Sequence, residues 1–512
     1  MGLRPARAVR EAGGQRVAGG GMYDVAVVGG GIAGMATAAR LQRRGLSTVV
    51  LEAHGQPGGC AGFFRRRGFA FDVGATTLVD FGPGGVGGEL LEEIGSPPLE
   101  REELQGYVAW MPDRVVTLDR DPAAWAVERA RQFGDTPAHR AFWALLDRLA
   151  SAFWAASRRG VKLPILSPGD AVRAVRSLGL ANLGLARYLN WTLADALRRH
   201  GLQDDRPLVA ILGMLIENAV HSTVDDAPLV NAALGVTIWG AGQSRAKGGM
   251  RGFWRVLADR YRELGGELRV GRAVERVEGR EGAFRVVTRK DALEAGRVVM
   301  AVPIASAARI GPPGLAEAVA GYRRRDDEAV GGAVVAYLGV PESEVAGQRF
   351  QHHLVLEDYD RPLGDGNNMF ISVSGPGDLE SAPEGCRAVV MSTHCELADW
   401  EGLSPEAYAA KKEEAGERLV GLARRAYPDL GRAALVREFA TPRTYERYTR
   451  RPRGAVGGAK LSLANANQRS VPHDVGVPGV WLAGDGTWPG LGTVACCLGS
   501  RIIADDLVAR AR

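Results

Sequence analysis

The chain has 512 residues, of which 46% are hydrophobic and 24% are charged, the balance of an ordinary globular protein. This composition argues against a disordered chain and against a bundle of membrane-spanning helices. The formal charge of +5 is small for this length, so no nucleic-acid partner is indicated. The five cysteines are odd in number and show no C-x-x-C spacing. They predict neither a disulfide framework nor a zinc site, and they favour a reducing compartment.

The first 21 residues are rich in Arg, Gly and Ala and lack the apolar stretch of a signal peptide. We expect residues 1–21 to be a disordered extension, or an upstream start that precedes a natural one at Met22. The sequence contains no run of about eighteen uninterrupted apolar residues, so a transmembrane helix is not expected.

Residues 23–52 have the pattern of a strand, a glycine turn, a helix and a second strand. Gly29, Gly31 and Gly34 stand at G-x-G-x-x-G spacing, in which the glycines allow a tight turn, a close approach to pyrophosphate and contact of helix with strand. Glu52 ends the second strand, where an acid binds a ribose hydroxyl and repels a 2′-phosphate. The pattern predicts dinucleotide binding; the alternative is a glycine-rich turn without a ligand.

A second glycine-rich segment follows, with the sequence PGGCAGFFRRRGFAFDVGAT from Pro57 to Thr76. Its arginines could meet phosphate or form a solvated hairpin tip. Together with residues 23–52, the segment resembles the flavin amine oxidase and phytoene desaturase superfamily. It is especially similar to the bacterial carotenoid desaturases and the related carotenoid isomerases. Many of these relatives carry Arg where this chain has Cys60, which leaves a side-chain phosphate contact open at that position.

Residues 85 to about 240 alternate helical patterns with turns and hold no second nucleotide motif. Between Arg158 and Arg199, eight Arg and Lys residues stand against two Asp and alternate with Leu, Ile, Trp and Tyr. This pattern fits a face that lies in a bilayer interface. It also fits a pair of helices that cover a core and expose their arginines. The resemblance favours the first interpretation, because carotene-processing relatives draw lipid-soluble substrates from membranes.

A loop bracketed by glycines precedes an amphipathic helix at about residues 250–264, and strands follow at 267–270 and 273–277. In the superfamily this order returns the chain to the nucleotide domain, where the position resembling Val274 packs beside the adenine. Residues 297–303 are then expected to form another buried strand of that domain. We predict that the loop faces the flavin, against the alternative of an ordinary helix start; its residues are Lys247, Gly248, Gly249 and Met250.

Strand-like runs at residues 329–340, 352–357, 369–374 and 387–394 follow one another with short connections, which predicts an antiparallel sheet of a second domain. Residues 405–427 have the composition of a charged surface helix. His352 and His353 are adjacent, but no third metal-ligating residue stands at a spacing typical of metal sites. We therefore expect no metal site.

The C-terminal segment has the same pattern of strand, glycine-containing loop and helix as the N-terminal segment. A strand is expected to end at Gly484-Asp485, a loop to continue through Gly492, and a helix to begin at Thr493. The loop resembles the closing motif of the superfamily, whose aspartate, matched here by Asp485, bonds the ribityl chain. The positive end of the helix is expected to face the flavin and to stabilise its reduced form.

The resemblance implies an α/β fold with a Rossmann-like FAD-binding domain built from discontinuous segments at about 22–105, 241–305 and 440–512. An α+β substrate domain with an antiparallel sheet, which faces the membrane, is expected from 106–240 and 306–439. The residues expected to bind FAD are Gly29, Gly31, Ile32, Ala33, Gly34, Glu52, Ala53, Gly58, Gly59, Cys60, Thr76, Val274, Gly484, Asp485, Gly492, Thr493 and Val494.

The resemblance predicts an FAD-dependent carotenoid desaturase, which removes hydride from a C–C bond of an acyclic polyene. The sequences at 233–244 and 441–458 are similar to the C-3′,4′ desaturases. Desaturation releases a proton, for which His221, Asp225 and Asp226 are candidate acceptors. Three alternatives stay open: a carotenoid cis–trans isomerase that uses reduced FAD, an amine oxidase-like flavoenzyme, and a non-catalytic FAD-binding escort protein. We expect quinone or oxygen as electron acceptor and a cytoplasmic protein peripheral to the inner face of the cell membrane.

Overall fold

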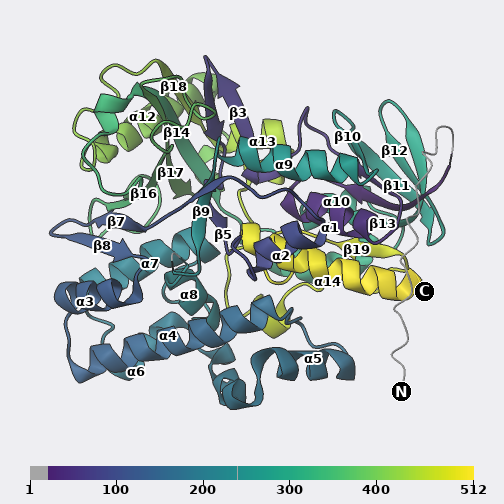
Figure 1. Ribbon diagram of the computed structural model, residues 1–512, viewed down its shortest axis with the longest axis horizontal. Helices are drawn as coiled ribbons and strands as arrows, with labels where there is room; N and C mark the ends of the chain where they lie inside the picture. The colour runs from purple at the N-terminus through teal and green to yellow at the C-terminus, as the bar shows by residue number, and fades with distance from the viewer. Residues whose placement is uncertain (1–20, 239, 512) are drawn as a thin grey trace, which may run out of the picture.

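A computed structural model describes residues 21–238 and 240–511 of the chain (Figure 1). The predicted disordered extension lies outside these residues, except for its last residue. The fold is α/β, as the sequence predicts, and two seven-stranded sheets form its frame. Within the described residues, no helix has both the length and the apolar character needed to cross a membrane.

The first sheet gathers strands from both ends and the middle of the chain. Parallel strands lie in the order β10, β2, β1 and β13, with β19 paired to β13, and the antiparallel strands β12 and β11 extend it. The bounds are β1 Tyr23–Val28, β2 Thr48–Leu51, β10 Glu267–Arg269, β11 Val274–Arg280, β12 Ala283–Thr288, β13 Ala292–Met300 and β19 Val480–Leu482. The strand expected at 297–303 is the second half of β13.

Helices cover both faces of this sheet, which explains the uninterrupted apolar runs of its strands. Val25 and Val27 of β1 face a core with α1, α2, α9 and α14, whereas Ala26 and Val28 face a core with α10 and α11. The bounds are α1 Ile32–Arg43, α2 Val86–Glu93, α9 Met250–Glu263, α10 Ile304–Ile310, α11 Leu315–Asp326 and α14 Thr493–Ala511. Helices from opposite ends of the chain, α1 and α14, therefore lie side by side (Figure 1).

The second sheet has the order β18-β14-β17-β16-β15-β7-β8, and α12 covers one of its faces. The strands expected from the sequence do pair antiparallel, β14 with β17, β17 with β16 and β16 with β15. The sheet is extended by β18, antiparallel to β14, and by β7, which is parallel to β15. The strands at 101–119, in a stretch expected to be helical, were not predicted. The bounds are β6 Arg101–Glu103, β7 Gly106–Trp110, β8 Val115–Asp119, β14 Gly332–Pro341, β15 His352–Leu356, β16 Asn368–Val373, β17 Cys386–Cys395, β18 Val436–Ala440 and α12 Pro405–Ala423.

Smaller pairings connect the two sheets. A hairpin of β3 and β4 carries the three arginines of the second glycine segment at its exposed tip, and β5, β9 and β6 form a small antiparallel sheet. The bounds are β3 Phe63–Arg66, β4 Phe69–Asp72, β5 Leu78–Val79 and β9 Gln243–Ala246; α13 is Pro442–Thr449, and single turns lie at η1 Gly59–Ala61, η3 Glu342–Val345, η4 Leu397–Trp400, η5 Pro452–Gly454 and η6 Asn467–Arg469.

A layer of helices lies below the sheets in Figure 1 and shares one apolar core with β7, β8 and β15. Asp121, Thr136 and Ser167 each accept hydrogen bonds from the first turn of a helix whose first residue is proline, a local signal that fixes where these helices begin. The bounds are α3 Pro122–Phe133, α4 Pro137–Arg158, α5 Pro168–Leu178, η2 Leu180–Asn190, α6 Leu193–His200, α7 Arg206–Val220 and α8 Leu229–Val236.

Candidate active site

A cavity of about 1280 Å³ lies where the two sheets meet. The residues at the carboxyl ends of β1, β2, β13 and β19 line one part of it, and side chains of β14, β15, β16 and β17 line another. The carboxyl edge of a parallel sheet is the usual ligand site of such folds. The cavity is therefore the candidate active site.

The glycines of the first motif shape this edge in three different ways. Gly29 has φ +109°, and a Cβ there would lie 2.3 Å from the Ala301 carbonyl oxygen, so only glycine allows the turn. A Cβ at Gly34 would lie 2.1 Å from the Gly29 carbonyl oxygen, because α1 packs tightly on the turn. Gly31 lines the cavity, and a Cβ there would meet nothing within 4 Å. The space over Gly31 is the passage that a pyrophosphate needs.

Glycines from the other end of the chain leave open space in the same cavity. A Cβ at Gly484 (φ +127°) or Gly492 (φ +110°) would meet no atom within 4 Å. The N-termini of α1 and α14 both line the cavity, so two sets of unpaired N–H groups and two positive helix ends reach it. This arrangement fits an anionic dinucleotide.

Glu52, the residue predicted to bind a ribose, directly follows β2 and lines the cavity. Its carboxylate accepts the N–H groups of Gly30 and His54, each at 2.7 Å, which orients the side chain on the first loop. Burial raises the pKa of Glu52, although these backbone hydrogen bonds oppose the shift.

All 17 residues expected to bind the cofactor line this one cavity, although they come from five separate stretches of the chain. They are Gly29, Gly31, Ile32, Ala33, Gly34, Glu52, Ala53, Gly58, Gly59, Cys60, Thr76, Val274, Gly484, Asp485, Gly492, Thr493 and Val494. The first and second glycine loops touch directly, through a parallel bridge between Gly31 and Gly58.

Arg451 is a cavity residue that the sequence did not predict. Its guanidinium lies 2.9 Å from a carboxylate oxygen of Asp485, and Arg451 also lies beside Cys60. Burial disfavours the charge of Arg451, but the combined interactions with Asp485, Cys60 and Cys496 outweigh burial and raise its pKa. In contrast, burial raises the pKa of the Cys60 thiol, so the thiol stays protonated. An arginine from a distant segment thus places a fixed positive charge beside Cys60.

The loop expected to face the flavin lies elsewhere. Lys247, Gly248, Gly249 and Met250 are absent from the described residues that line the cavity. Carboxylates hold the loop in place: the N–H of Gly248 binds Asp378, the N–H of Met250 donates to Asp72 at 2.7 Å, and Lys247 pairs with Glu100. The loop therefore has the geometry of an ordinary helix start, which was the alternative to the predicted flavin-facing loop. The structure gives no support for a contact between this loop and a flavin.

The three candidate proton acceptors separate in the structure. His221 lines the cavity at the end of α7, whereas Asp225 and Asp226 are exposed on a turn and do not line it. Asp226 instead accepts the hydroxyl of Thr223, which stabilises the turn. Of the three candidates, only His221 is in a position to act in the cavity.

Apolar side chains from α7, from the segment after α8 and from the second sheet line one part of the cavity. Leu215, Ile238, Leu354, Phe370 and Val390 line this part. We refer to these five residues as the apolar chamber. A chamber of this kind selects its ligand by shape and apolar contact.

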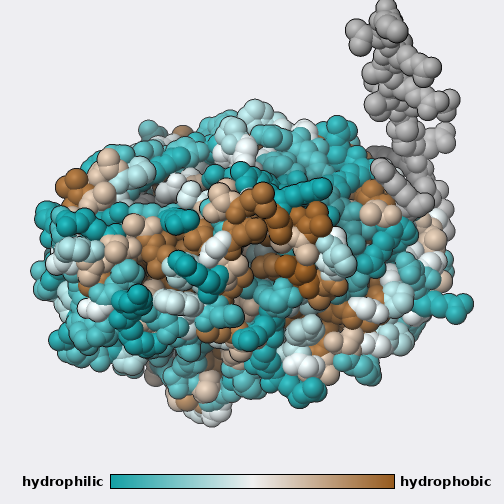
Figure 2. Space-filling view, turned by 90° about the horizontal axis from the view of Figure 1, so that it is seen from below, coloured by the Kyte–Doolittle hydropathy of each residue, from teal (hydrophilic) through white to brown (hydrophobic). Residues whose placement is uncertain are grey.

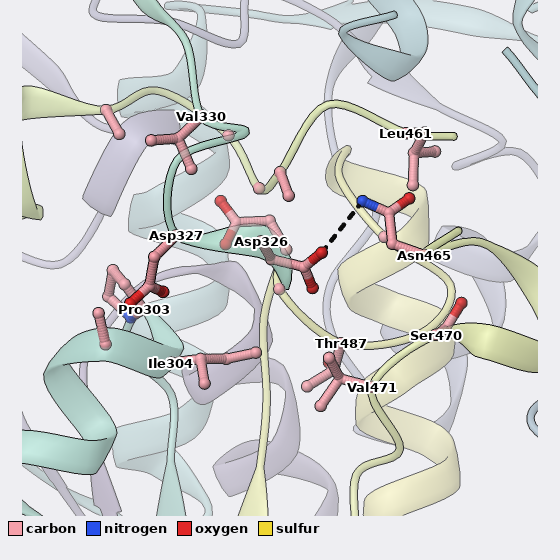
Figure 3. A pocket seen from close by; sticks show the side chains of 18 of the residues that line it. Pro303, Ile304, Asp326, Asp327, Val330, Leu461, Asn465, Ser470, Val471 and Thr487 are labelled. Carbon is pink, nitrogen blue, oxygen red and sulfur yellow. Dashed lines mark hydrogen bonds between the residues drawn. The ribbon is translucent and has the colours of Figure 1, made fainter. Parts of the chain in front are cut away.

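A smaller cavity of about 120 Å³ is shown in Figure 3, and Arg451 and Asp485 line both cavities. Its carboxylates are already paired, because Asp326 contacts Arg325 at 2.6 Å and Asn465 at 3.3 Å, and Asp327 contacts Arg323 at 2.9 Å. In the part of the chain that the structure describes, no group of three or more His, Cys, Asp or Glu side chains could hold a metal ion.

Comparisons with known proteins agree with this geometry. Residues 27–94 match the family model of the NAD(P)-binding Rossmann-like domain. Prolycopene isomerase of Arabidopsis thaliana is 26% identical over 97% of this chain and 84% of its own length. Phytoene desaturase (lycopene-forming) of Pantoea ananas is 27% identical over 56% of each chain. Among solved structures, cyclohexylamine oxidase from Brevibacterium oxydans has 16% identity and a TM-score of 0.60, over 96% of this chain and all of its own, which shows a shared fold.

Proposed function

We propose that this chain, which belongs to the carotenoid desaturase and isomerase family, is an FAD-dependent enzyme that modifies an acyclic carotenoid. The proposal rests on one cavity that has two parts. One part is lined by the 17 residues expected to bind the cofactor, which we call the dinucleotide cradle, and the other part is the apolar chamber. A ligand without hydrogen-bonding groups can be held in such a chamber by shape alone.

The cradle residues account for cofactor binding. The open space over Gly31 and the N-termini of α1 and α14 suit the phosphates and the flavin, Glu52 suits the adenosine ribose, and Asp485 suits the ribityl chain. The bound FAD would accept a hydride from a saturated C–C bond of the substrate. The protein orients the polyene, keeps water from the reacting carbons and, through His221, accepts the proton that desaturation releases.

Desaturation is the reaction we propose first, with quinone or oxygen as the final electron acceptor. Cis–trans isomerisation is the second candidate, because the similarity to a prolycopene isomerase extends over 97% of this chain. Both reactions need the same cradle and the same apolar chamber, and they differ in whether the product loses two hydrogens.

We further propose that α5 and η2 contact an anionic membrane surface. Half of the twelve large hydrophobic residues that are exposed in the described chain lie on these two elements or just before α5: Ile165, Leu166, Val172, Val175, Leu180 and Leu183. Apolar side chains gather around a hollow on this face (Figure 2). Arg173, Arg176 and Arg187 are exposed on the same elements. Apolar groups flanked by arginines favour a bilayer interface over open water.

Pigment analysis tests the proposed function. Cells that make lycopene or 1-hydroxylated acyclic carotenes would be grown with and without this gene, and their pigments separated by liquid chromatography with mass and absorption detection. A product lighter by two hydrogens indicates desaturation and locates the bond. A product of unchanged mass with a new cis–trans pattern indicates isomerisation. Unchanged pigment despite FAD-loaded protein would contradict the proposal and favour an escort or amine-directed role.

A further inference from the structure

Two histidines interrupt the lining beside the apolar chamber. His221 ends α7 and His394 lies on β17, and both line the cavity. Their ring centroids are 4.5 Å apart with the planes at 68° to each other. Leu215 and Ile238 line the same cavity nearby in the helical layer. A hydrocarbon ligand has no group that could form a hydrogen bond with an imidazole, so ligand binding does not explain why two histidines line the cavity here.

A buried carboxylate lies beside the pair. Glu217, one turn before His221 on α7, is 9% exposed, and its Oε1 is 3.6 Å from Nδ1 of His394. Its other oxygen accepts a hydrogen bond from the side-chain amide of Asn368 at the start of β16. A carboxylate buried in this way needs partners. Here its partners are an amide, which fixes its orientation, and an imidazole, whose protonated form it stabilises.

The backbone at His221 also departs from the ordinary pattern. His221 has φ +48° and ψ +48° and ends the helix in the left-handed conformation that glycine adopts at least cost. The chain crosses over its ring at Gly457, where a Cβ would lie 2.5 Å from Cε1 of His221. A side chain kept in a costly backbone conformation, with the neighbouring loop shaped around it, points to a functional role.

The charged groups around His221 come from several elements. Burial lowers the pKa of His221 well below its ordinary value, and His394, Arg451 and Lys460 lower it further. Nδ1 of His221 has no hydrogen-bond partner in the described structure. The imidazole is therefore held in its neutral form, which can accept a proton. Glu217 is the nearby negative charge that can stabilise a proton after it has moved to His394.

We propose that His221, His394 and Glu217 form a proton relay between the apolar chamber and the surface. This inference rests on the proposed desaturation. In that reaction one carbon gives a hydride to FAD, the adjacent C–H bond supplies the electron pair of the new double bond, and His221 takes the released proton. His394 receives the proton from His221, and its imidazolium is stabilised by Glu217. His221 is the base that contacts the substrate. His394 and Glu217 act through His221: His394 takes the proton from it, and Glu217 orients and stabilises His394.

Further acidic groups are electrostatic neighbours of Glu217. Burial raises the pKa of Asp365, and the charges of Asp399, Glu396 and Glu217 raise it further, whereas Lys411 lowers it. Glu396 and Asp399 are exposed. Asp365 therefore has both Glu217 and two exposed acidic residues among its charged neighbours.

Three variants test the relay in the FAD-loaded protein: Glu217→Gln, which keeps the shape of the side chain, His394→Gln, and His221→Gly, which suits the backbone at that position. Glu414→Gln, the same exchange at an exposed position of α12, is the control. FAD content and thermal unfolding are measured first, and then the rate of flavin reduction in a single anaerobic turnover with carotenoid in vesicles.

We expect His221→Gly to lose about 100-fold or more in rate and to be rescued by added imidazole, and Glu217→Gln and His394→Gln to lose about 10-fold or more. Glu414→Gln should match the wild type. A merely structural role would not produce rescue by imidazole. Wild-type rates in His221→Gly and Glu217→Gln, or a loss that imidazole does not restore, would overturn the relay.

A second measurement does not depend on turnover. In the FAD-free protein at one fixed pH, nuclear magnetic resonance of the histidine side chains reports the ring nitrogens of His394. Glu217→Gln should change the signal of the His394 Nδ1 atom, because an amide group replaces the carboxylate oxygen 3.6 Å from that atom, whereas Glu414→Gln should not. An unchanged signal would overturn the relay. If the wild type converts no carotenoid, the proposed function fails, and this signal still decides whether Glu217 and His394 are in contact.

Discussion

Single glycines decide whether the cradle can hold a dinucleotide. Gly31 and Gly55 both have open space where a Cβ would lie, but Gly31 lines the cavity and Gly55 does not. We expect Gly31→Val to lose FAD while thermal unfolding of the FAD-free protein stays within about 1 kcal/mol of wild type, since the new side chain fills only the passage for pyrophosphate. Flavin content after purification measures the effect.

Gly55→Val is the matched control for this substitution, and it should keep its full flavin content. Full flavin occupancy in Gly31→Val would mean that the pyrophosphate does not pass over Gly31, and the assignment of the cradle would be withdrawn.

At the same scale, the sequence placed the glycines and Glu52 in one site, because this expectation follows from local spacing. It identified neither Arg451 nor His394, because their roles depend on tertiary contacts with residues far away in sequence. Arg451 stands in an arginine-rich stretch where nothing local distinguishes it from its neighbours.

Elements were predicted well where their patterns are local. α12 and α14 begin at the positions expected from the sequence, after a Ser-Pro pair and a glycine loop respectively. α1 begins at Ile32, inside the glycine motif and earlier than its expected start after Gly34. The order of strands in the second sheet could not be predicted, because the pairing of β14 with β17 skips over two intervening strands. The loop at 247–250 was misplaced because its partners, Asp72 and Asp378, lie in other parts of the chain.

The surface of α5 and η2 has exposed apolar side chains and exposed arginines, and substitutions can test the two separately. We expect Leu166→Ser with Leu180→Ser to weaken binding to vesicles that contain anionic lipid, because these side chains are 62% and 77% exposed and bury apolar area only in a bilayer. Arg173→Ser, Arg176→Ser and Arg187→Ser together should weaken binding to anionic vesicles more than to neutral ones.

Sedimentation with vesicles measures both sets of variants. Leu379→Ser, at another exposed leucine outside these elements, is the control. Binding that is unchanged in both sets would show that α5 and η2 are an ordinary solvated layer over the helical core.

On the scale of the whole molecule, several histidines are buried and neutral, and they tie stability to pH. Burial lowers the pKa of His352 to about 3, and that of His353 and His473 to about 4. His353 also accepts the indole N–H of Trp110 at 3.1 Å, so protonation would break this bond. The folded pKa values lie below the unfolded value of about 6.5, so the unfolded chain takes up more protons as pH falls.

Stability from these groups is therefore fully present above about pH 6.5 and is lost as pH falls toward 4, at about 1.4 kcal/mol per pH unit for each histidine. Thermal unfolding measured across this range should show a falling midpoint, and His353→Gln should make the fall shallower. A midpoint that stays constant between about pH 6.5 and pH 5 would contradict the burial of neutral histidines.

The cavity is a property of the whole chain, since residues from the first strand to the last helix line it. The family resemblance at the two ends predicted this discontinuous assembly, and local patterns alone would not have done so. The central claim is that one cavity brings a bound flavin to an acyclic carotenoid.

Anaerobic mixing of FAD-loaded protein with an acyclic carotene in vesicles tests this claim most directly, with the flavin absorbance and the carotene followed together. Our account predicts bleaching of the oxidised flavin with a carotene product two hydrogens lighter, or, for the isomerase, a new cis–trans pattern once the flavin has been reduced chemically. A flavin that stays oxidised beside an unchanged carotene, and that causes no isomerisation after reduction, would contradict it.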